Sequence, residues 1–253
     1  MIKGSVSFSL FLVAFVLVYF YFADYVRKGK PFSIRRIPGL DAITEAVGRC
    51  TEMGRPVHYT FGTFEFSANH LASFDVLAHT ATLCARTGTD IICTTARPEI
   101  TPIAEEIIRA AYAREGKMDA FKPDNIRFLS TTQNAYVQSI HGIFMREKPA
   151  ANLLLGAFNA ESLQLSEVGQ QIGAMQIAGT GRTNHIPFFI ATCDYVLIGD
   201  ELFASGAYIS RQPGQVGALF AQDFGKWLTI GLVIIGTLMT TIGNKSLTDL
   251  MKR

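Results

Sequence analysis

Two long apolar stretches lie near the ends of the chain, and shorter apolar runs alternate with polar residues between them. The first stretch extends from Ser5 to Tyr25 and carries no charge before Asp24. The second extends from Trp227 to Gly243 and contains no charged residue. About twenty apolar residues form a helix long enough to cross the hydrocarbon core of a bilayer. The pattern therefore predicts a transmembrane helix at each end of the chain.

The first stretch is predicted to be an uncleaved anchor. A signal peptide, the alternative, has a positively charged start, a shorter apolar run and small residues at its cleavage site. Here only Lys3 precedes the run, which ends in four aromatic residues, Tyr19, Phe20, Tyr21 and Phe22. Aromatic rings with a polar edge suit the boundary between membrane and water, so these residues favour an anchor.

The charges on either side of the first stretch predict the orientation of the protein. Lys3 precedes the stretch, whereas five cations follow it, namely Arg27, Lys28, Lys30, Arg35 and Arg36. An excess of cations marks the cytoplasmic side, so the main domain is expected to face the cytoplasm at the inner membrane. The basic tail with Lys245, Lys252 and Arg253 would then lie outside, against the same tendency. The alternative is a second segment that packs at the membrane without crossing it.

Between these stretches, helical periodicity alternates with short apolar runs. Helices are predicted over Asp41–Met53, His70–Thr87, Pro98–Arg114, Gln133–Met145, Ala160–Gln171 and Glu201–Ser210. Strands are predicted over Pro56–Phe61, Asp90–Thr94, Asn125–Leu129 and Asn152–Gly156. Three further apolar segments are interpreted as a strand-rich end of the sheet: Ala174–Ala178, Pro187–Thr192 and Tyr195–Ile198. This alternation predicts an α/β fold with a mainly parallel sheet and helices on both faces, a Rossmann-like arrangement.

These patterns divide the chain into six segments. They are an N-terminal anchor (1–25), a basic juxtamembrane segment (26–37), a cytoplasmic α/β domain (38–211), a linker (212–225), a C-terminal transmembrane helix (226–244) and a tail (245–253). The expected packing residues of the second membrane helix are small, because small residues let membrane helices approach closely. They are Gly231, Gly236 and Thr240.

Charge and cysteine content exclude several classes of partner. The net charge is +2 and only 17% of the residues are charged. The basic run 27–36 is best explained by anionic lipid headgroups, and no other basic cluster indicates a nucleic-acid partner. The four cysteines, Cys50, Cys84, Cys93 and Cys193, form no CxxC pair and have no histidine at metal-ligand spacing. A reduced compartment and no metal site are therefore expected.

The candidate ligand-binding residues follow the predicted strands, because open parallel sheets bind ligands beyond the carboxyl ends of their strands. They are Thr94, Arg97, Thr132, Asn134 and Arg182. The alternative explanation for such residues is that helices need polar N-caps.

The segment Gly179–Arg182 is the nearest approach to a phosphate loop. It lacks the third glycine of the dinucleotide fingerprint and is followed by a predicted strand at Pro187, so it is interpreted as a turn. No GxSxG motif is present, the five histidines are scattered, and no catalytic residue is predicted. The cofactor, if any, stays open.

Two segments carry a family resemblance, GRPVHYTFG (Gly54–Gly62) and YVLIGDELFASGAYIS (Tyr195–Ser210). The chain resembles an uncharacterised prokaryotic family of membrane-anchored proteins, known as a domain of unknown function, over Pro38–Ser210 and the flanking anchors. The resemblance implies a Rossmann-like cytoplasmic domain and supplies no activity.

Two functions are therefore considered. The first is a non-enzymatic, membrane-tethered assembly subunit or scaffold, a homo-oligomer or a part of a larger membrane complex. The alternative is a membrane-bound enzyme or sensor that binds a nucleotide or another anionic small molecule in the crevice at the strand ends.

Overall fold

The computed structural model describes residues 5–28 and 34–241 of the 253-residue chain. The chain divides into two compact units. We call the unit Arg35–Ile209 the α/β domain. The other unit comprises the segments at the two ends of the chain, and we call its two described helices the helical hairpin.

Six strands form the sheet of the α/β domain, in the order β3-β2-β1-β4-β5-β6. They are β1 (Val57–Thr60), β2 (Ile91–Thr95), β3 (Ile126–Phe128), β4 (Ala151–Leu155), β5 (Met175–Thr180) and β6 (Tyr195–Ile198). Every neighbouring pair is parallel, which confirms the predicted parallel sheet. The chain proceeds outward in opposite directions from β1 and β4, so these two strands form the topological switch point of the sheet.

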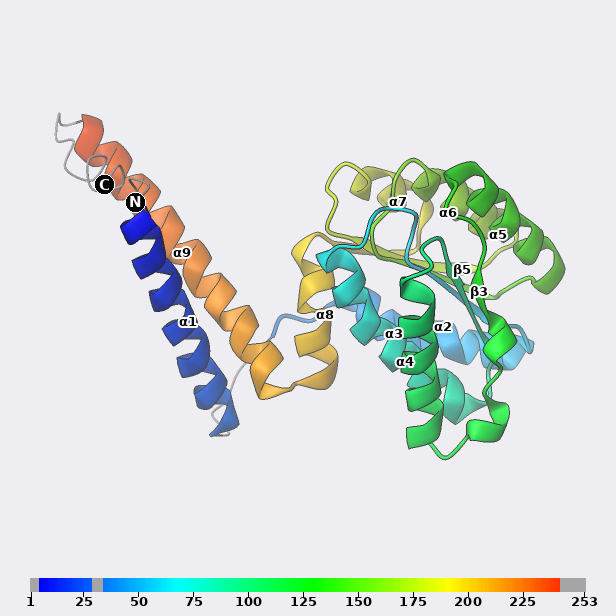
Figure 1. The fold of residues 1–253 in the computed structure, drawn as a ribbon. Helices are drawn as coiled ribbons and strands as arrows, with labels where there is room; N and C mark the ends of the chain where they lie inside the picture. The colour runs from blue at the N-terminus through cyan, green and yellow to red at the C-terminus, as the bar shows by residue number, and fades with distance from the viewer. Residues whose placement is uncertain (1–4, 29–33, 242–253) are drawn as a thin grey trace. The chain divides into compact units, whose positions relative to one another are not determined.

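Helices cover both faces of this sheet, as Figure 1 shows. One face is covered by α2 (Pro38–Met53), α3 (Ala68–Thr87), α4 (Ile100–Arg114) and α8 (Asp200–Ser210). The other face is covered by α5 (Gln133–Glu147), α6 (Glu161–Gln171) and α7 (Ile186–Thr192). Two short 3-10 turns, Met118–Ala120 and Pro123–Asn125, precede β3. The α/β class and the helices on both faces agree with the prediction.

Local sequence explains where several helices begin and end. Pro38 stands at the start of α2, where a missing backbone N–H costs nothing. Gly54 ends α2 with φ +61°, and Gly88 ends α3 with φ +72°. Both glycines adopt the left-handed helical backbone conformation, which lets backbone N–H groups reach the last free carbonyls of a helix.

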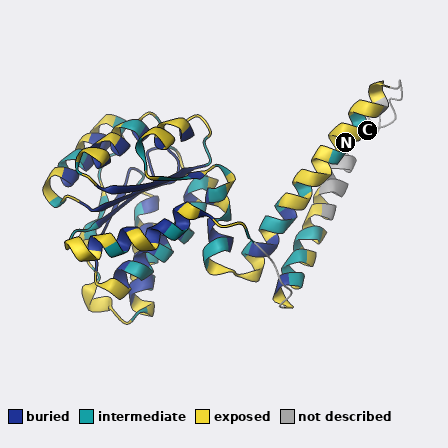
Figure 2. Cartoon of the chain, turned by 180° about the vertical axis from the view of Figure 1, so that it is seen from behind, coloured by how far each residue is buried: buried dark blue, intermediate teal, exposed yellow. Residues whose placement is uncertain are grey.

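The core of the α/β domain lies in two layers, one on each side of the sheet. Strand side chains alternate between them, so that Tyr59 and Leu153 face α2 to α4 while Ile92 and Leu154 face α5 and α6. Figure 2 shows the strands buried between helices whose outer surfaces are exposed. A sheet covered on both faces explains the continuously apolar strands in the sequence.

The prediction of a strand over Pro187–Thr192 is wrong, because this segment lies in the helix α7. A short apolar run does not distinguish a strand from a buried helical turn by periodicity. Pro187 stands in the first turn of α7, a position that proline favours.

The segment 212–225, expected as a linker, lies mainly within a helix. The helix α9 runs without interruption from Pro213 to Thr241. Among the described residues, one helix is long and apolar enough to cross a membrane, and the qualifying range is Pro213–Leu238. The helix α9 thus begins well before the predicted segment 226–244.

In the helical hairpin, α9 lies antiparallel beside α1 (Ser5–Arg27), as Figure 1 shows. The rings of Phe22 and Phe220 stack with their centroids 5.7 Å apart. A Cβ atom at Gly217 would lie 2.8 Å from the backbone of Ala23, so this glycine allows the two helices to approach closely.

The predicted packing residues of the second membrane helix lie apart from these contacts. Among the residues that the structure describes, a Cβ atom at Gly231 would meet nothing within 4 Å. Thr240 is exposed, and its hydroxyl donates to the carbonyl oxygen of Gly236 at 2.9 Å. That these residues pack against helices of other chains stays a prediction.

Candidate functional site

The loops that follow β1 and β4 meet through their backbones at the switch point. The Ala157 amide donates to Phe61 O at 2.9 Å, and the Phe64 amide donates to Ala157 O at 3.1 Å. Gly62 and Gly156 permit this approach, because a Cβ atom on either would lie 2.3 Å from a carbonyl oxygen of the facing loop. The backbone of the chain itself therefore closes the gap between the two loops where sheets of this topology commonly bind ligands.

Glu161, the first residue of α6, is the centre of hydrogen bonding at this edge. Its side chain is fully buried. Oε1 accepts from the Thr63 amide at 2.9 Å, the Thr63 hydroxyl at 2.6 Å and the Asn159 amide at 3.0 Å. Oε2 accepts from Gln133 Nε2 at 2.9 Å. Amides near a helix start attract anions, and here a carboxylate of the chain occupies that position.

Arg97 and Arg182, two of the predicted ligand-binding residues, both hold the loop after β1. Arg97 Nη2 donates to Thr63 O at 3.0 Å, and its Nε donates to the carbonyl oxygens of Thr63 and Phe64. The Arg182 guanidinium lies 3.8 Å from the centre of the Phe64 ring, and its Nη1 donates to Asn159 Oδ1 at 3.1 Å. The structure brings these arginines to one loop and directs the named donors at the protein itself.

The other three predicted residues lie apart from this loop. Thr94 is fully buried in β2, where its hydroxyl lies 2.9 Å from His58 Nε2. Thr132 and Asn134 are exposed at the start of α5, where Thr132 is the N-cap residue. The five predicted residues therefore do not line a common cavity as the structure describes it.

In the segment Gly179–Arg182, two backbone amides donate hydrogen bonds to side chains of the protein itself. The Gly181 amide donates to Asn69 Oδ1 at 2.8 Å, and the Arg182 amide donates to Thr180 Oγ1 at 3.2 Å. The loop leads towards the seven-residue helix α7 instead of the predicted strand. These amide partners support its interpretation as a structural turn.

A buried row of polar side chains crosses three strands, and sequence reasoning missed it. His58 on β1, Asn152 on β4 and Gln176 on β5 are neighbours in register and all buried. Asn152 Nδ2 donates to Gln176 Oε1 at 2.9 Å, and Gln176 Nε2 donates to the carbonyl oxygens of Ser166 and Thr192. The one signal in the sequence was a polar residue inside each of three apolar strands.

A second buried histidine lies on α3. The His70 ring stacks between those of Phe61 and Phe66, with centroid separations of 6.3 and 5.7 Å. Its Nδ1 accepts from the Ser67 amide at 3.2 Å, whereas its buried Nε2 has no hydrogen-bond partner within residues 5–28 and 34–241. Burial lowers the pKa of His70 to about 4, so the ring is neutral at physiological pH.

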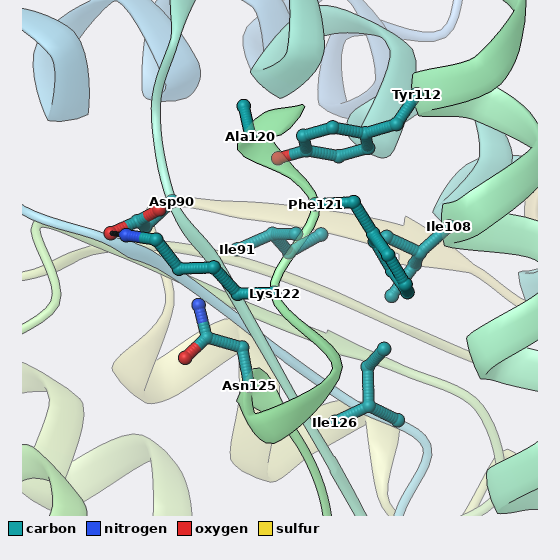
Figure 3. A pocket seen from close by; sticks show the side chains of 9 residues that line it. All are labelled: Asp90, Ile91, Ile108, Tyr112, Ala120, Phe121, Lys122, Asn125 and Ile126. Carbon is teal, nitrogen blue, oxygen red and sulfur yellow. Dashed lines mark hydrogen bonds and ion pairs between the residues drawn. The ribbon is translucent and has the colours of Figure 1, made fainter. Parts of the chain in front are cut away.

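The cavities described in the α/β domain lie away from the carboxyl ends of β1 and β4. Figure 3 shows one at the amino ends of β2 and β3, where Lys122 Nζ lies 2.7 Å from Asp90 Oδ2. Its volume of about 10 Å³ holds roughly one water molecule. A wider depression of about 350 Å³ lies over α5 and β3 beside Arg127 and Arg146.

In the part of the chain that the structure describes, the thiol groups are buried or half-buried and the acidic side chains form no metal-binding cluster. Burial raises the pKa of the Cys50 and Cys193 thiols to about 12, and it raises the pKa of Cys84 and Cys93 as well. A thiol of this kind is a poor nucleophile, because the thiolate is the reactive form. No group of three or more His, Cys, Asp or Glu side chains is placed to hold a metal ion within residues 5–28 and 34–241.

A comparison with protein families matches residues 2–251 to a family described as "Domain of unknown function (DUF6754)". The chain belongs to this family. The match spans the α/β domain and both helices of the hairpin, so the two units are parts of one family domain. The resemblance noted in the sequence is thereby confirmed. Neither the curated proteins nor the solved structures yielded a match.

Proposed function

We propose that the protein is a non-enzymatic, membrane-tethered assembly subunit whose α/β domains associate side by side at the cytoplasmic face of the inner membrane. The observation that carries the proposal is the apolar surface of the helical hairpin. Leu17 and Phe20 on α1 are 64% and 62% exposed, and Val233 on α9 is 62% exposed. Continuous apolar surface of this kind indicates contact with a membrane or another apolar partner. If both helices of the hairpin cross the bilayer, the lipid chains cover this apolar surface.

The charge pattern supports the cytoplasmic placement of the α/β domain. Five cations follow the apolar run of α1 whereas only Lys3 precedes it. The two helices of the hairpin are antiparallel, so the chain leaves and re-enters the membrane on the same side. The α/β domain is inserted between them and would occupy the side that bears the cations.

The edges of the sheet support association of the α/β domains. β3 and β6 are its outer strands, and Phe128 on β3 and Ile198 on β6 are large apolar residues that are 45% and 52% exposed. Exposed edge strands are common sites of pairing between chains. Two edges per domain would allow copies to associate side by side.

The alternative of a nucleotide or anion crevice has less support. The loops after β1 and β4 are joined by backbone hydrogen bonds, and Glu161 places a negative charge where a phosphate would have to bind. Arg97 and Arg182 already hold the Phe64 loop.

The native mass of the full-length chain in mild detergent tests the proposal. Light scattering with the detergent subtracted is expected to give one defined mass of several subunits. A monomer would contradict the proposal. Thermal unfolding with nucleotides and phosphorylated metabolites would then be measured, because a bound ligand stabilises the folded protein. Stabilisation by one of them that Arg97→Ala abolishes would establish the alternative.

A further inference from the structure

The outer strand β3 directs part of its backbone away from the rest of the sheet. Just after β3, the Leu129 amide donates to Thr95 O on β2 at 3.1 Å. Backbone groups along a strand point alternately to its two sides, so Phe128 directs its N–H and C=O groups outward. No strand follows on that side, because β3 is the first strand in the order of the sheet. An extended segment of another chain can pair with such an edge.

The depression of about 350 Å³ described above lies along this edge, on the face of the sheet that α5 covers. The α5 residues that line it extend from Gln138 to Arg146, a length of about 12 Å on a helix. An extended chain covers this length with about four residues. The side chains of Leu129 and Ile143 give the depression an apolar part. The depression thus has the length of a short strand laid between β3 and α5.

The positive charges of this depression come from two arginines that differ in their partners. Both Nη1 and Nη2 of Arg127 bind the carboxylate of Glu147, so the chain itself pairs this cation. Arg146 is exposed, and its Nη1 lies 3.3 Å from the position of a Cβ atom on Gly142. Within residues 5–28 and 34–241, the Arg146 side chain forms no ion pair or hydrogen bond. The depression therefore offers one cation to a ligand.

This single cation favours one carboxylate over a polyanion. Nucleic acid is held by several cations that act together, and the Glu147 carboxylate beside Arg127 would repel it. A guanidinium binds one carboxylate with strong, charge-assisted hydrogen bonds. The outer strands of this chain are IRF in β3 and YVLI in β6, and neither contains an acidic residue. The edge strand of a second copy would therefore bring no carboxylate to Arg146.

We propose that the edge of β3 and the depression beside it bind an extended segment of a partner protein, with an acidic side chain of that segment at Arg146. Side chains alternate along a strand, so the neighbours of this acid would lie on the opposite face of the sheet. Phe128 lies on that face and is 45% exposed, because Leu129, the next residue, packs on the α5 side. The expected segment thus carries one acidic residue between two apolar ones.

Peptide binding to the full-length chain in mild detergent tests this inference. The probe is a fluorescein-labelled Thr-Val-Glu-Val-Thr amide, and the control peptide carries glutamine in place of glutamate. Fluorescence anisotropy is expected to show binding of the glutamate peptide that is on the order of fivefold tighter, because the glutamine peptide lacks one exposed ion pair. Arg146→Gln is expected to abolish this difference. Arg114→Gln, which changes an exposed arginine at the end of α4, is the matched control and is expected to preserve it.

Hydrogen exchange locates the bound peptide. The outward amide of Phe128 is expected to exchange more slowly with the glutamate peptide bound, since it then donates to the peptide backbone. Unchanged exchange at Phe128 would overturn the inference, and so would the absence of binding at about 1 mM peptide. An equal loss of affinity in Arg146→Gln and Arg114→Gln would also overturn it.

Two outcomes separate this inference from the proposed function, which it goes beyond. A lower particle mass of Arg146→Gln in detergent would show that a second copy occupies the β3 edge, and it would overturn the partner segment alone. A monomeric wild-type chain that binds the glutamate peptide would overturn the proposed function alone. The two can fail separately, because copies can associate through the β6 edge and the helical hairpin while β3 binds the partner.

Discussion

His58 and Asn152 face each other across the junction of β1 and β4, with the imidazole Nδ1 2.8 Å from the amide Oδ1. Because the Asn152 amide group donates to Gln176, its oxygen is the acceptor and His58 Nδ1 carries the proton. The imidazole thus donates to Asn152 and takes part in a buried row of hydrogen bonds. A row of this kind stabilises the fold only when each member has its partner.

The buried imidazole predicts a loss of stability in mild acid. Burial lowers the pKa of His58 from 6.5 to about 4. The unfolded chain therefore binds a proton at His58 below about pH 6.5, whereas the folded chain binds it only below about pH 4. This contribution to the free energy of unfolding is complete above about pH 6.5 and is lost as the pH falls from 6.5 to 4. We expect urea unfolding followed by circular dichroism to show a free energy of unfolding lower by about 2 kcal/mol from this group at pH 5 than at pH 7.5.

The variant His58→Asn separates this effect from other titrations. Asparagine takes up no proton in this range, so the variant is expected to be less stable at pH 7.5 but to lose less stability on acidification than the wild type. An equal loss in both proteins would show that His58 is not the group responsible.

Glu161 and Gln133 predict a compensating pair of substitutions. Glu161→Gln brings an amide N–H₂ group towards Gln133 Nε2, so that two donors face each other in place of the present bond at 2.9 Å. A buried donor without an acceptor costs about 1–3 kcal/mol. Adding Gln133→Glu restores an acceptor, so the double variant is expected to recover part of the lost urea midpoint. A double variant less stable than the sum of the two single changes predicts would contradict this geometry.

The closed switch point predicts a difference between two glycines of similar backbone conformation. Gly62 and Gly54 have φ values of +84° and +61°. Alanine at Gly54 meets open space, whereas alanine at Gly62 places its Cβ atom 2.3 Å from Ala157 O. Both substitutions carry backbone strain of roughly 1–3 kcal/mol, and Gly62→Ala must in addition separate the two loops. Thermal unfolding is expected to show the larger loss for Gly62→Ala, and equal losses would mean that the loops are not in contact.

The hairpin predicts different roles for glycines on different sides of α9. Gly217→Leu forces α9 away from the backbone of Ala23, so amide hydrogen exchange in the described part of α1 is expected to accelerate. Gly231→Leu points into open space and should leave exchange in α1 unchanged. If Gly231 and Gly236 pack against other copies, replacing both with leucine reduces the particle mass in detergent. Unchanged particle size would contradict that role.

Periodicity along the chain was sufficient to predict the α/β class and most of its elements. Apolar residues at helical spacing predicted α2 to α6, and glycines predicted the ends of α2 and α3, because these features arise from residues within a few positions of one another. It was not sufficient for Pro187–Thr192, since a six-residue apolar run fits a strand or a helical turn equally well. It also did not show that the polar segment before Trp227 continues the helix of the second apolar stretch.

The sequence by itself determined where the strands, the helices of the α/β domain other than α7 and the two terminal apolar helices occur. Only the tertiary structure decided that the switch point is closed, that Glu161 meets Thr63 from 98 positions away, and that His58 pairs with Asn152. It also decided that Gly217 of α9 lies against Ala23 of α1. The physical reason is distance along the chain: local spacing specifies secondary structure, whereas contacts between distant residues depend on register and packing that no local pattern records.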